Sequence, residues 1–176
     1  MRHVALLRGI GPGNPKMRNG ELVRVLEGVG LRDVEAVISS GNYVFSTDEG
    51  DRSTLEDLIE AGLEVHLGAP CSTIVRSRNQ IEGLCRLDVF AGRGDGPDAR
   101  CHVTFLKRRP PAGHALPSGG DGYEVLSLQR QAVFLVVDGT RSKTPDVMAQ
   151  MERAFGKEIT TRTWRTVQRI RRALEG

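Results

Sequence analysis

The sequence is poor in aromatic residues and cysteines, and it has no long apolar run. Aromatic residues make up 5% of the 176 positions, which gives little support for an RNA-stacking surface. The three cysteines, Cys71, Cys85 and Cys101, fit neither a disulfide framework nor the C-x-x-C spacing of zinc sites. No apolar run approaches the roughly 20 residues that cross a bilayer. We therefore expect a cytoplasmic protein with reduced thiols and no membrane contact.

Motifs for catalysis and for cofactors are also missing. The four histidines do not have the spacing of metal ligands, and no G-x-S-x-G nucleophile elbow occurs. The glycine-rich segment that begins at Gly9 departs from G-x-G-x-x-G at Asn14, and no G-K-[ST] follows it. We expect no metal and no cofactor, and the sequence does not decide whether the protein is an enzyme.

Charge is distributed unevenly along the chain. Residues 1–92 carry ten Lys and Arg against thirteen Asp and Glu, a net charge of −3. Residues 93–176 carry fifteen against nine, a net charge of +6. The basic excess gathers at 107–110 and toward the C-terminus, where it predicts either a solvated helix or a surface that attracts anions.

The order of apolar patterns is the same in both halves of the chain. In the first half, the strand-like segments are 3–8, 34–40, 42–47 and 71–77, and the helical stripes are 22–29, 55–63 and 81–85. Ser53 or Thr54 is the expected N-cap of the second helix. In the second half, strand-like segments begin at 101, 123, 132 and 160, and helical segments span 147–155 and 167–174. Because 110–120 holds three prolines and three glycines, this half can form at most a turn or two of its first helix.

These patterns predict an α+β fold. The β-α-β-β-α-β order is that of a ferredoxin-like unit, so we expect a tandem duplication with mixed or antiparallel sheets and helices on one face. The expected repeats are 1–92 and 99–176, joined by a turn-rich bridge at 93–98, and they form either two domains or one compact body.

Polar clusters lie at corresponding places in the two repeats. Residues 39–42 read SSGN at a β-β junction, and 138–144 read DGTRSKT ahead of a helix, where N–H groups and cations favour an anion. Residues 160–167 read TTRTWRTV and are expected to form a strand that alternates Thr161, Thr163 and Arg165 on one face with Trp164 on the other. Trp164 is interpreted either as a ligand contact or as a core or edge residue.

The opening segment and these clusters resemble domain-of-unknown-function family 1697, a family of bacterial proteins. The matching segments read ALLRGIGPGN, KMRNGEL, ISSGNYVF, TRSKT and TTRTWRTV, in order over nearly the whole chain. The resemblance implies a duplicated α+β unit without an assigned function. The chain departs from the family pattern at Thr163 and Arg165, which replace two Asn residues beside Trp164, and this exchange alters hydrogen-bonding capacity.

The leading hypothesis is a site for a small phosphorylated or carboxylated ligand between the two repeats. Its expected residues supply positive charge, hydroxyl or amide groups and one aromatic ring: Arg8, Lys16, Ser40, Asn42, Arg141, Ser142, Lys143, Thr161, Arg162, Trp164 and Arg165. Any chemistry there would be group transfer or hydrolysis assisted by electrostatics. At the opening loop, the alternative is that the glycines and prolines only shape the exit from the first strand.

Two other functions remain open from the sequence. One is RNA binding across a sheet face, using the basic second half with Tyr43, Phe45, Phe105 and Phe134, although no RNP1-like run is present. The other is a non-catalytic regulatory or dimerisation module, in which the polar clusters serve only as caps and turns. The protein is expected to be a monomer or a homodimer.

Overall fold

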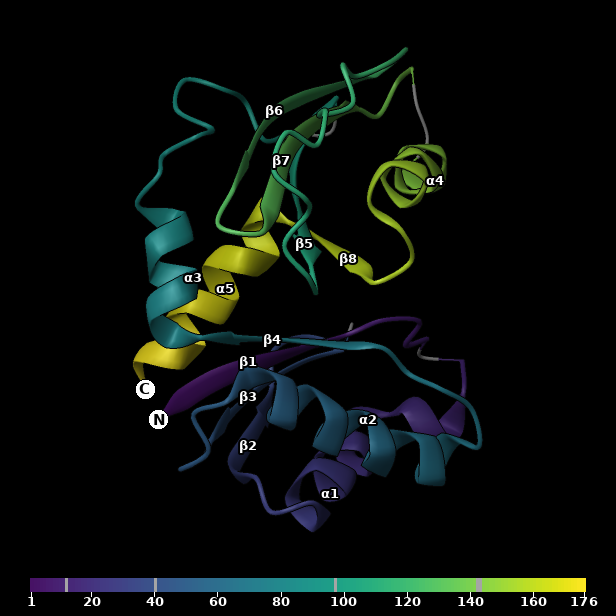
Figure 1. Ribbon diagram of the computed structural model, residues 1–176, viewed down its shortest axis with the longest axis vertical. Coiled ribbons are helices and arrows are strands. Elements are labelled where there is room, and N and C mark those ends of the chain that lie inside the picture. The colour runs from purple at the N-terminus through teal and green to yellow at the C-terminus, as the bar shows by residue number, and fades with distance from the viewer. Residues whose placement is uncertain (12, 40, 97, 142–143) are drawn as a thin grey trace. The chain divides into compact units, whose positions relative to one another are not determined.

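The computed structural model describes residues 1–11, 13–39, 41–96, 98–141 and 144–176 (Figure 1). The strands are β1 (Arg2–Leu7), β2 (Arg32–Ala36), β3 (Asn42–Ser46), β4 (Thr73–Ser77), β5 (Ala99–Leu106), β6 (Tyr123–Gln129), β7 (Ala132–Asp138) and β8 (Ile159–Thr163). The helices are η1 (Pro15–Met17, one 3-10 turn), α1 (Asn19–Gly28), α2 (Arg52–Leu67), α3 (Arg78–Cys85), α4 (Thr144–Phe155) and α5 (Trp164–Glu175). Because the strands form two four-stranded antiparallel sheets, the expected α+β class is confirmed.

The chain divides into two compact units. The first unit comprises Met1–Glu82 with Arg169–Gly176, and the second comprises Gly83–Gln168. The chain therefore passes from one unit to the other within α3 and again within α5. The repeat boundaries expected from the sequence stay a prediction.

In the first unit, β1 and β3 are the central strands of a sheet with the order β2-β3-β1-β4. Helices α1 and α2 lie on the same face of this sheet (Figure 1). Their buried side chains pack on alternate residues of the central strands, as a period of two requires. The buried core on this face includes Leu22, Leu26, Leu55, Ile59 and Leu63 of the helices and Ala5, Leu7, Tyr43, Phe45 and Val75 of the sheet. The helical stripes expected from the sequence are confirmed for both helices.

Helix α2 begins at Arg52, and its N-cap is Asp51. The Oδ1 atom of Asp51 accepts hydrogen bonds from the backbone N–H of Thr54 at 2.7 Å and from its hydroxyl at 2.9 Å. The expected N-cap at Ser53 or Thr54 is wrong because Asp51 already satisfies the free N–H group of the first turn. These hydrogen bonds lower the pKa of Asp51, and its negative charge suits the positive end of the helix dipole.

The outer edge of β4 is closed by side chains of α2 and α3. Alternate N–H groups of the strand donate to these side chains: Thr73 to Oε1 of Glu60 (2.7 Å), Val75 to Oε1 of Glu56 (3.0 Å) and Ser77 to Oε1 of Gln80 (2.9 Å). Gln80 returns a backbone hydrogen bond to the Ser77 hydroxyl, so these two residues also form a capping box that starts α3. An edge closed in this way offers no N–H row to a second strand.

In the second unit, β7 and β5 are the central strands of a sheet with the order β6-β7-β5-β8. Helix α4 packs on one face of this sheet, where Val147 and Met151 contact a core that includes Leu135. On the other face, the Phe134 ring lies 5.6 Å from that of Phe90. The connection 107–122 between β5 and β6 contains no helix, as its prolines and glycines predict.

Candidate functional site

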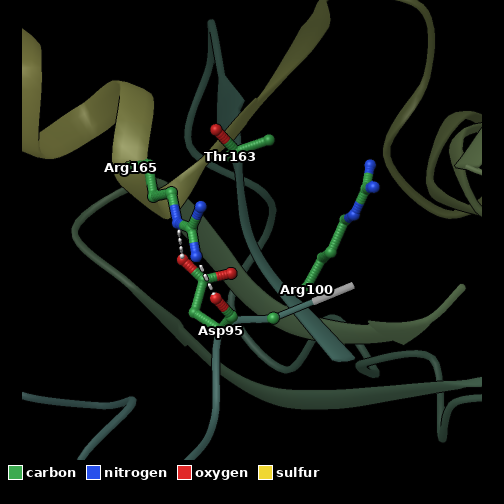
Figure 2. Close-up of a pocket in the computed structure, with 5 residues that line it drawn as sticks. Asp95, Arg100, Thr163 and Arg165 are labelled. Atoms are coloured by element: carbon green, nitrogen blue, oxygen red, sulfur yellow. Dashed lines mark hydrogen bonds and ion pairs between the residues drawn. The ribbon is translucent and has the colours of Figure 1, made fainter. Parts of the chain in front are cut away.

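A hollow of about 270 Å³ lies in the second unit, where β5 begins and β8 passes into α5. Asp95, Gly96, Arg100, Thr163 and Arg165 line it (Figure 2). It opens to solvent beside two exposed guanidinium groups, so it combines a concave surface with positive charge.

Asp95 forms hydrogen bonds to both β5 and α5 at the hollow. Its Oδ1 accepts a hydrogen bond from the backbone N–H of Cys101 at 3.2 Å, which fixes the loop to β5. Its Oδ2 accepts from Nε of Arg165 at 3.2 Å, and its backbone oxygen accepts from Nη2 of the same arginine. Since a guanidinium carries five N–H donors, Arg165 is oriented by Asp95 and still has donors for a ligand.

Thr163 starts α5 at the rim of the hollow. Its Oγ1 accepts from the backbone N–H of Thr166 at 3.2 Å and lies 2.9 Å from the Thr166 hydroxyl. The strand expected over 160–167 therefore ends at Thr163, and the predicted alternation through Trp164 and Arg165 is wrong. The threonine cap turns the chain into a helix and places Arg165 in the first turn, where the helix dipole favours an anion.

Arg100 supplies the second cation of the hollow. Its side chain is exposed and makes no hydrogen bond or ion pair with another side chain in the described part of the protein. Figure 2 shows it extending from β5 away from Asp95, whereas Arg165 turns toward that carboxylate. The two arginines and one aspartate give the hollow a net charge of +1. Burial lowers the pKa of the nearby His102, so that imidazole is neutral at pH 7 and adds no charge.

Most of the other predicted residues of the second unit have structural contacts. Thr161 hydrogen bonds to the Thr104 hydroxyl at 2.7 Å. Arg162 donates to Oγ1 of Thr160 at 2.7 Å and to the backbone oxygen of Thr161 at 2.9 Å, and burial lowers its pKa to about 10. Arg141 forms an exposed ion pair with Asp121 at 2.6 Å. Of the predicted site residues that the structure describes in the second unit, only Arg165 lines the hollow.

Trp164 is half-buried and packs against two phenylalanines of the second unit. Its ring meets that of Phe90 edge-on, with 5.2 Å between the ring centroids, and it lies 6.5 Å from the Phe134 ring. Such edge-on and tilted pairs are typical of aromatic cores. The structure therefore favours the interpretation of Trp164 as a core or edge residue.

The predicted residues of the first unit also hold the fold together. Nζ of Lys16 donates to the backbone oxygen of His66 at 3.1 Å, and Nε2 of His66 lies 3.0 Å from the backbone oxygen of Lys16. Asn42 is fully buried, and its Nδ2 donates to the backbone oxygen of Val37 at 3.2 Å. Arg8 is half-buried at the end of β1, where its backbone N–H donates to Ser72 at 2.9 Å. The remaining candidates, Ser40, Ser142 and Lys143, lie outside the described residues.

Sequence reasoning missed Asp95, Gly96 and Arg100. Asp95 belongs to a segment interpreted as a turn-rich bridge, and its ionic partner Arg165 lies 70 residues away. No local pattern signals a contact over that separation. Thr163 was noted as one residue of the expected strand and as a departure from the family pattern, and it was not among the predicted site residues.

Clusters of metal ligands and membrane-spanning helices are both absent from the described part of the chain. No group of three or more His, Cys, Asp and Glu side chains in these residues could hold a metal ion. In the same residues, none of the helices is both long and apolar enough to span a bilayer.

Comparisons with known proteins identify the family and the fold. No curated protein matches the chain. A solved structure, that of the conserved bacterial protein SP0830 from Streptococcus pneumoniae, is similar with a TM-score of 0.70 and 21% identity, and the match covers 99% of this chain and 98% of that one. At that identity the likeness shows the fold alone. Residues 1–134, about three quarters of the chain, match the family described as "Protein of unknown function (DUF1697)". The resemblance seen in the sequence motifs is therefore confirmed at the level of the family, and the chain belongs to DUF1697.

Proposed function

We propose that this protein binds a small carboxylate or phosphate anion in the hollow of its second unit. The observation that carries the proposal is the meeting of two guanidinium groups with the first turn of α5. Arg165 is held there by Asp95, Arg100 has no competing side-chain partner among the described residues, and Thr163 caps the helix. Charge-assisted hydrogen bonds from arginine to an oxyanion are about twice as strong as hydrogen bonds between neutral groups.

The dimensions and the charge of the hollow favour a small ligand. Its volume of about 270 Å³ lies just below the range of about 300–1,000 Å³ that holds drug-sized molecules. Its net charge of +1 suits a single anionic group. The sequence predicted a ligand between the two repeats, which stays a prediction, whereas the proposed site uses residues of the second unit alone.

The residues of the hollow are suited to binding and orienting an anion. Asp95 accepts hydrogen bonds from Arg165 and from the Cys101 backbone, so its role is to position those groups. If the site also carries out chemistry, the arginines would stabilise negative charge that develops on a bound carboxylate or phosphate. We propose binding as the function, and group transfer or hydrolysis would be an addition to it.

Calorimetric titration with acetate and with inorganic phosphate tests the proposal. The wild-type protein should bind at least one of them, and Arg100→Met and Arg165→Met should each weaken binding about tenfold or more, the value of one charge-assisted hydrogen bond. Arg172→Met is the matched control, because Arg172 is an exposed arginine of the same helix outside the hollow. Absence of binding to both probes, or equal affinities in all variants, would refute the site. Binding of single-stranded RNA that falls steeply with salt would instead favour the RNA-binding alternative.

We further propose that the two units are copies of one ferredoxin-like unit. The sheets have corresponding strand orders, β2-β3-β1-β4 and β6-β7-β5-β8. Arg76 faces Val4 across β1 and β4, and Arg162 faces Val103 across β5 and β8. Each guanidinium donates to the backbone oxygen of the preceding residue, at 2.7 Å and 2.9 Å respectively, and burial lowers the pKa of each to about 10. The same register and the same hydrogen bond to the preceding residue support a duplication.

We also propose a location in the bacterial cytoplasm. The three cysteines are free, and Cys71 and Cys101 are buried. Burial raises the pKa of both thiols, to about 11 for Cys71, so they are stable as thiols in a reducing compartment. The similar solved structure is that of a bacterial protein. The proposed monomer or homodimer can be tested by light scattering during gel filtration.

A further inference from the structure

The outer edge of β8 in the second unit corresponds to the β4 edge that side chains close in the first unit. The backbone N–H of Lys107 in the β5 direction donates to the backbone oxygen of Glu158, and inward and outward groups alternate along an antiparallel edge strand. The N–H groups of Thr161 and Thr163 therefore point away from β5. Neither donates to an acceptor within the described part of the chain. Both residues are half-buried, so this stretch of the strand reaches the surface.

The first unit shows which chemical group this edge position accommodates. There, Val75 precedes Arg76 in the register at which Thr161 precedes Arg162. The Val75 N–H donates to a carboxylate oxygen of Glu56 at 3.0 Å, and Nη1 of Arg76 donates to the Val75 backbone oxygen at 2.7 Å. The Glu56 carboxylate is close enough to the guanidinium that its charge raises the pKa of Arg76 against the effect of burial.

Thr161 and Arg162 repeat the backbone part of this arrangement. Nη1 of Arg162 donates to the Thr161 backbone oxygen at 2.9 Å. Because the N–H and the oxygen of one strand residue point to the same side, the guanidinium lies at the edge to which the Thr161 N–H points. Burial lowers the pKa of Arg162, and a carboxylate on that N–H would offset this effect as Glu56 does in the first unit. The edge of β8 therefore suits a carboxylate supplied by a ligand.

This edge leads to the hollow at the start of α5. Thr163 is the last residue of β8 and also lines the hollow. It lies two residues from Thr161, a separation of about 6.6 Å along the strand. Arg165, which lines the same hollow, follows in the first turn of α5. A carboxylate at Arg165 and a carboxylate at the Thr161 N–H can thus belong to one short molecule.

We propose that the ligand of the hollow is a dicarboxylate, with one carboxylate at Arg165 and the other on the N–H of Thr161 beside Arg162. This inference rests on the proposed function and adds the class of ligand to it. The chain between the carboxylates spans about 6–7 Å, the length of two strand residues. Adipate, whose carboxyl carbons lie about this far apart when it is extended, has the required length.

Calorimetric titration of the whole protein with adipate, hexanoate and succinate tests the inference. Hexanoate has as many carbons as adipate but only one carboxylate. Adipate should bind about tenfold or more tightly than hexanoate, because the second carboxylate adds a charge-assisted hydrogen bond. Succinate is too short to reach both places and should bind more weakly than adipate.

Two substitutions of Thr161 separate its N–H from its side chain. Thr161→Pro removes the N–H at an edge position where proline costs no ladder hydrogen bond, so this variant should bind adipate no more tightly than hexanoate. Thr161→Val is the matched control, because it keeps the N–H and the branched shape and loses only the hydroxyl that bonds to Thr104. That side chain takes no part in the proposed contact, so Thr161→Val should keep the preference of the wild-type protein for adipate.

NMR of the ¹⁵N-labelled wild-type protein gives a readout that needs no variant to fold. Adipate should shift the amide resonance of Thr161, and hexanoate should leave it in place. Equal affinities for adipate and hexanoate, or an adipate preference retained by folded Thr161→Pro, would overturn the inference. If hexanoate binds at the hollow and adipate binds no better, the proposed function stands and only the dicarboxylate inference fails. If neither binds, both fail.

Discussion

The first unit covers its sheet and closes one of its edges, whereas the second unit leaves part of its surface open. In the first unit, α1 and α2 both pack on one face, and carboxylates of Glu56 and Glu60 accept hydrogen bonds from β4. In the second unit, the helix that would match α1 is replaced by the connection 107–122. The hollow at the start of α5 lies in the second unit. Two sheets with corresponding strand orders thus differ in use. The first has a face covered by two helices and a closed β4 edge, and the second belongs to the unit that holds the proposed binding site.

The largest expected effect concerns the closed edge of the first unit. Glu56 is fully buried, accepts from Val75 at 3.0 Å and lies 3.9 Å from Nε of Arg52. Glu56→Ala should lower the free energy of unfolding by about 3–5 kcal/mol, because it leaves the Val75 N–H without its acceptor and removes the negative charge that favours the charged form of the buried Arg76. Urea unfolding followed by circular dichroism measures the loss.

Two substitutions separate the causes of that effect. Glu56→Gln keeps an acceptor for Val75 but removes the charge, so it should recover part of the stability. Glu60→Ala removes a half-buried carboxylate from the same edge and should cost about 1–2 kcal/mol. Equal stability of Glu56→Ala and the wild-type protein would contradict the account of the closed edge.

The next effect concerns the core of the second unit. Trp164→Ala should cost about 3 kcal/mol, since it removes the ring that packs on Phe90 and Phe134. Trp164→Phe should cost less because it retains an aromatic ring. Differential scanning calorimetry measures both losses. If Trp164→Ala left the melting temperature unchanged and weakened anion binding instead, the ligand-contact interpretation would replace the core interpretation.

A smaller effect is expected at the cap of α5. Thr163→Ala removes the acceptor of the Thr166 N–H and should cost about 1 kcal/mol of stability. Because the same cap shapes the first turn beside Arg165, acetate affinity should fall as well. Thr163→Ser keeps the hydroxyl and serves as the matched control in thermal unfolding and in titration. An affinity loss equal in both variants would show that the hydroxyl is not the cause.

The pH dependence of the second unit provides a further test. Burial lowers the pKa of His102 below its ordinary value of 6.5, so the unfolded chain binds this proton more readily than the folded one. The buried, neutral His102 makes its full contribution to the free energy of unfolding above its pKa in the unfolded chain. That contribution is lost as the pH falls through 6.5 toward the lowered pKa of the folded protein. His102→Gln should reduce the slope of stability between pH 7 and pH 5. Burial also lowers the pKa of His3 in the first unit. The double variant His3→Gln, His102→Gln should therefore show a still smaller slope of the free energy of unfolding against pH. Slopes equal to that of the wild-type protein would contradict the assignment of the pH dependence to these histidines.

The smallest effect is expected at the exposed ion pair of the second unit. Nη2 of Arg141 lies 2.6 Å from Oδ1 of Asp121, and 64% and 78% of the two side chains are exposed. Solvent screens such pairs, so Arg141→Ala should change stability by less than about 1 kcal/mol and leave acetate affinity unchanged. A clear loss of acetate affinity would show that Arg141 contributes to anion binding, as the sequence predicted.

Local patterns predicted the elements better than they predicted the site. The stripe that includes Leu55 and Leu63 predicted α2, and the prolines of 110–120 predicted the missing helix, because both signals are local. The threonine-rich segment before Trp164 has the composition of a strand, and the cap at Thr163 that ends it became clear only in the structure. The pairing of Asp95 with Arg165 depends on the tertiary fold, so no spacing rule could supply it.

The claim that the second unit is the binding region can be tested most directly by locating the anion. Acetate is titrated into ¹⁵N-labelled protein, and the backbone amide resonances are followed by NMR. The account predicts saturable shifts at Gly96, Arg100 and the first turn of α5, with the β4 amides of the first unit unchanged. Shifts confined to the first unit, or none up to high millimolar acetate, would contradict it.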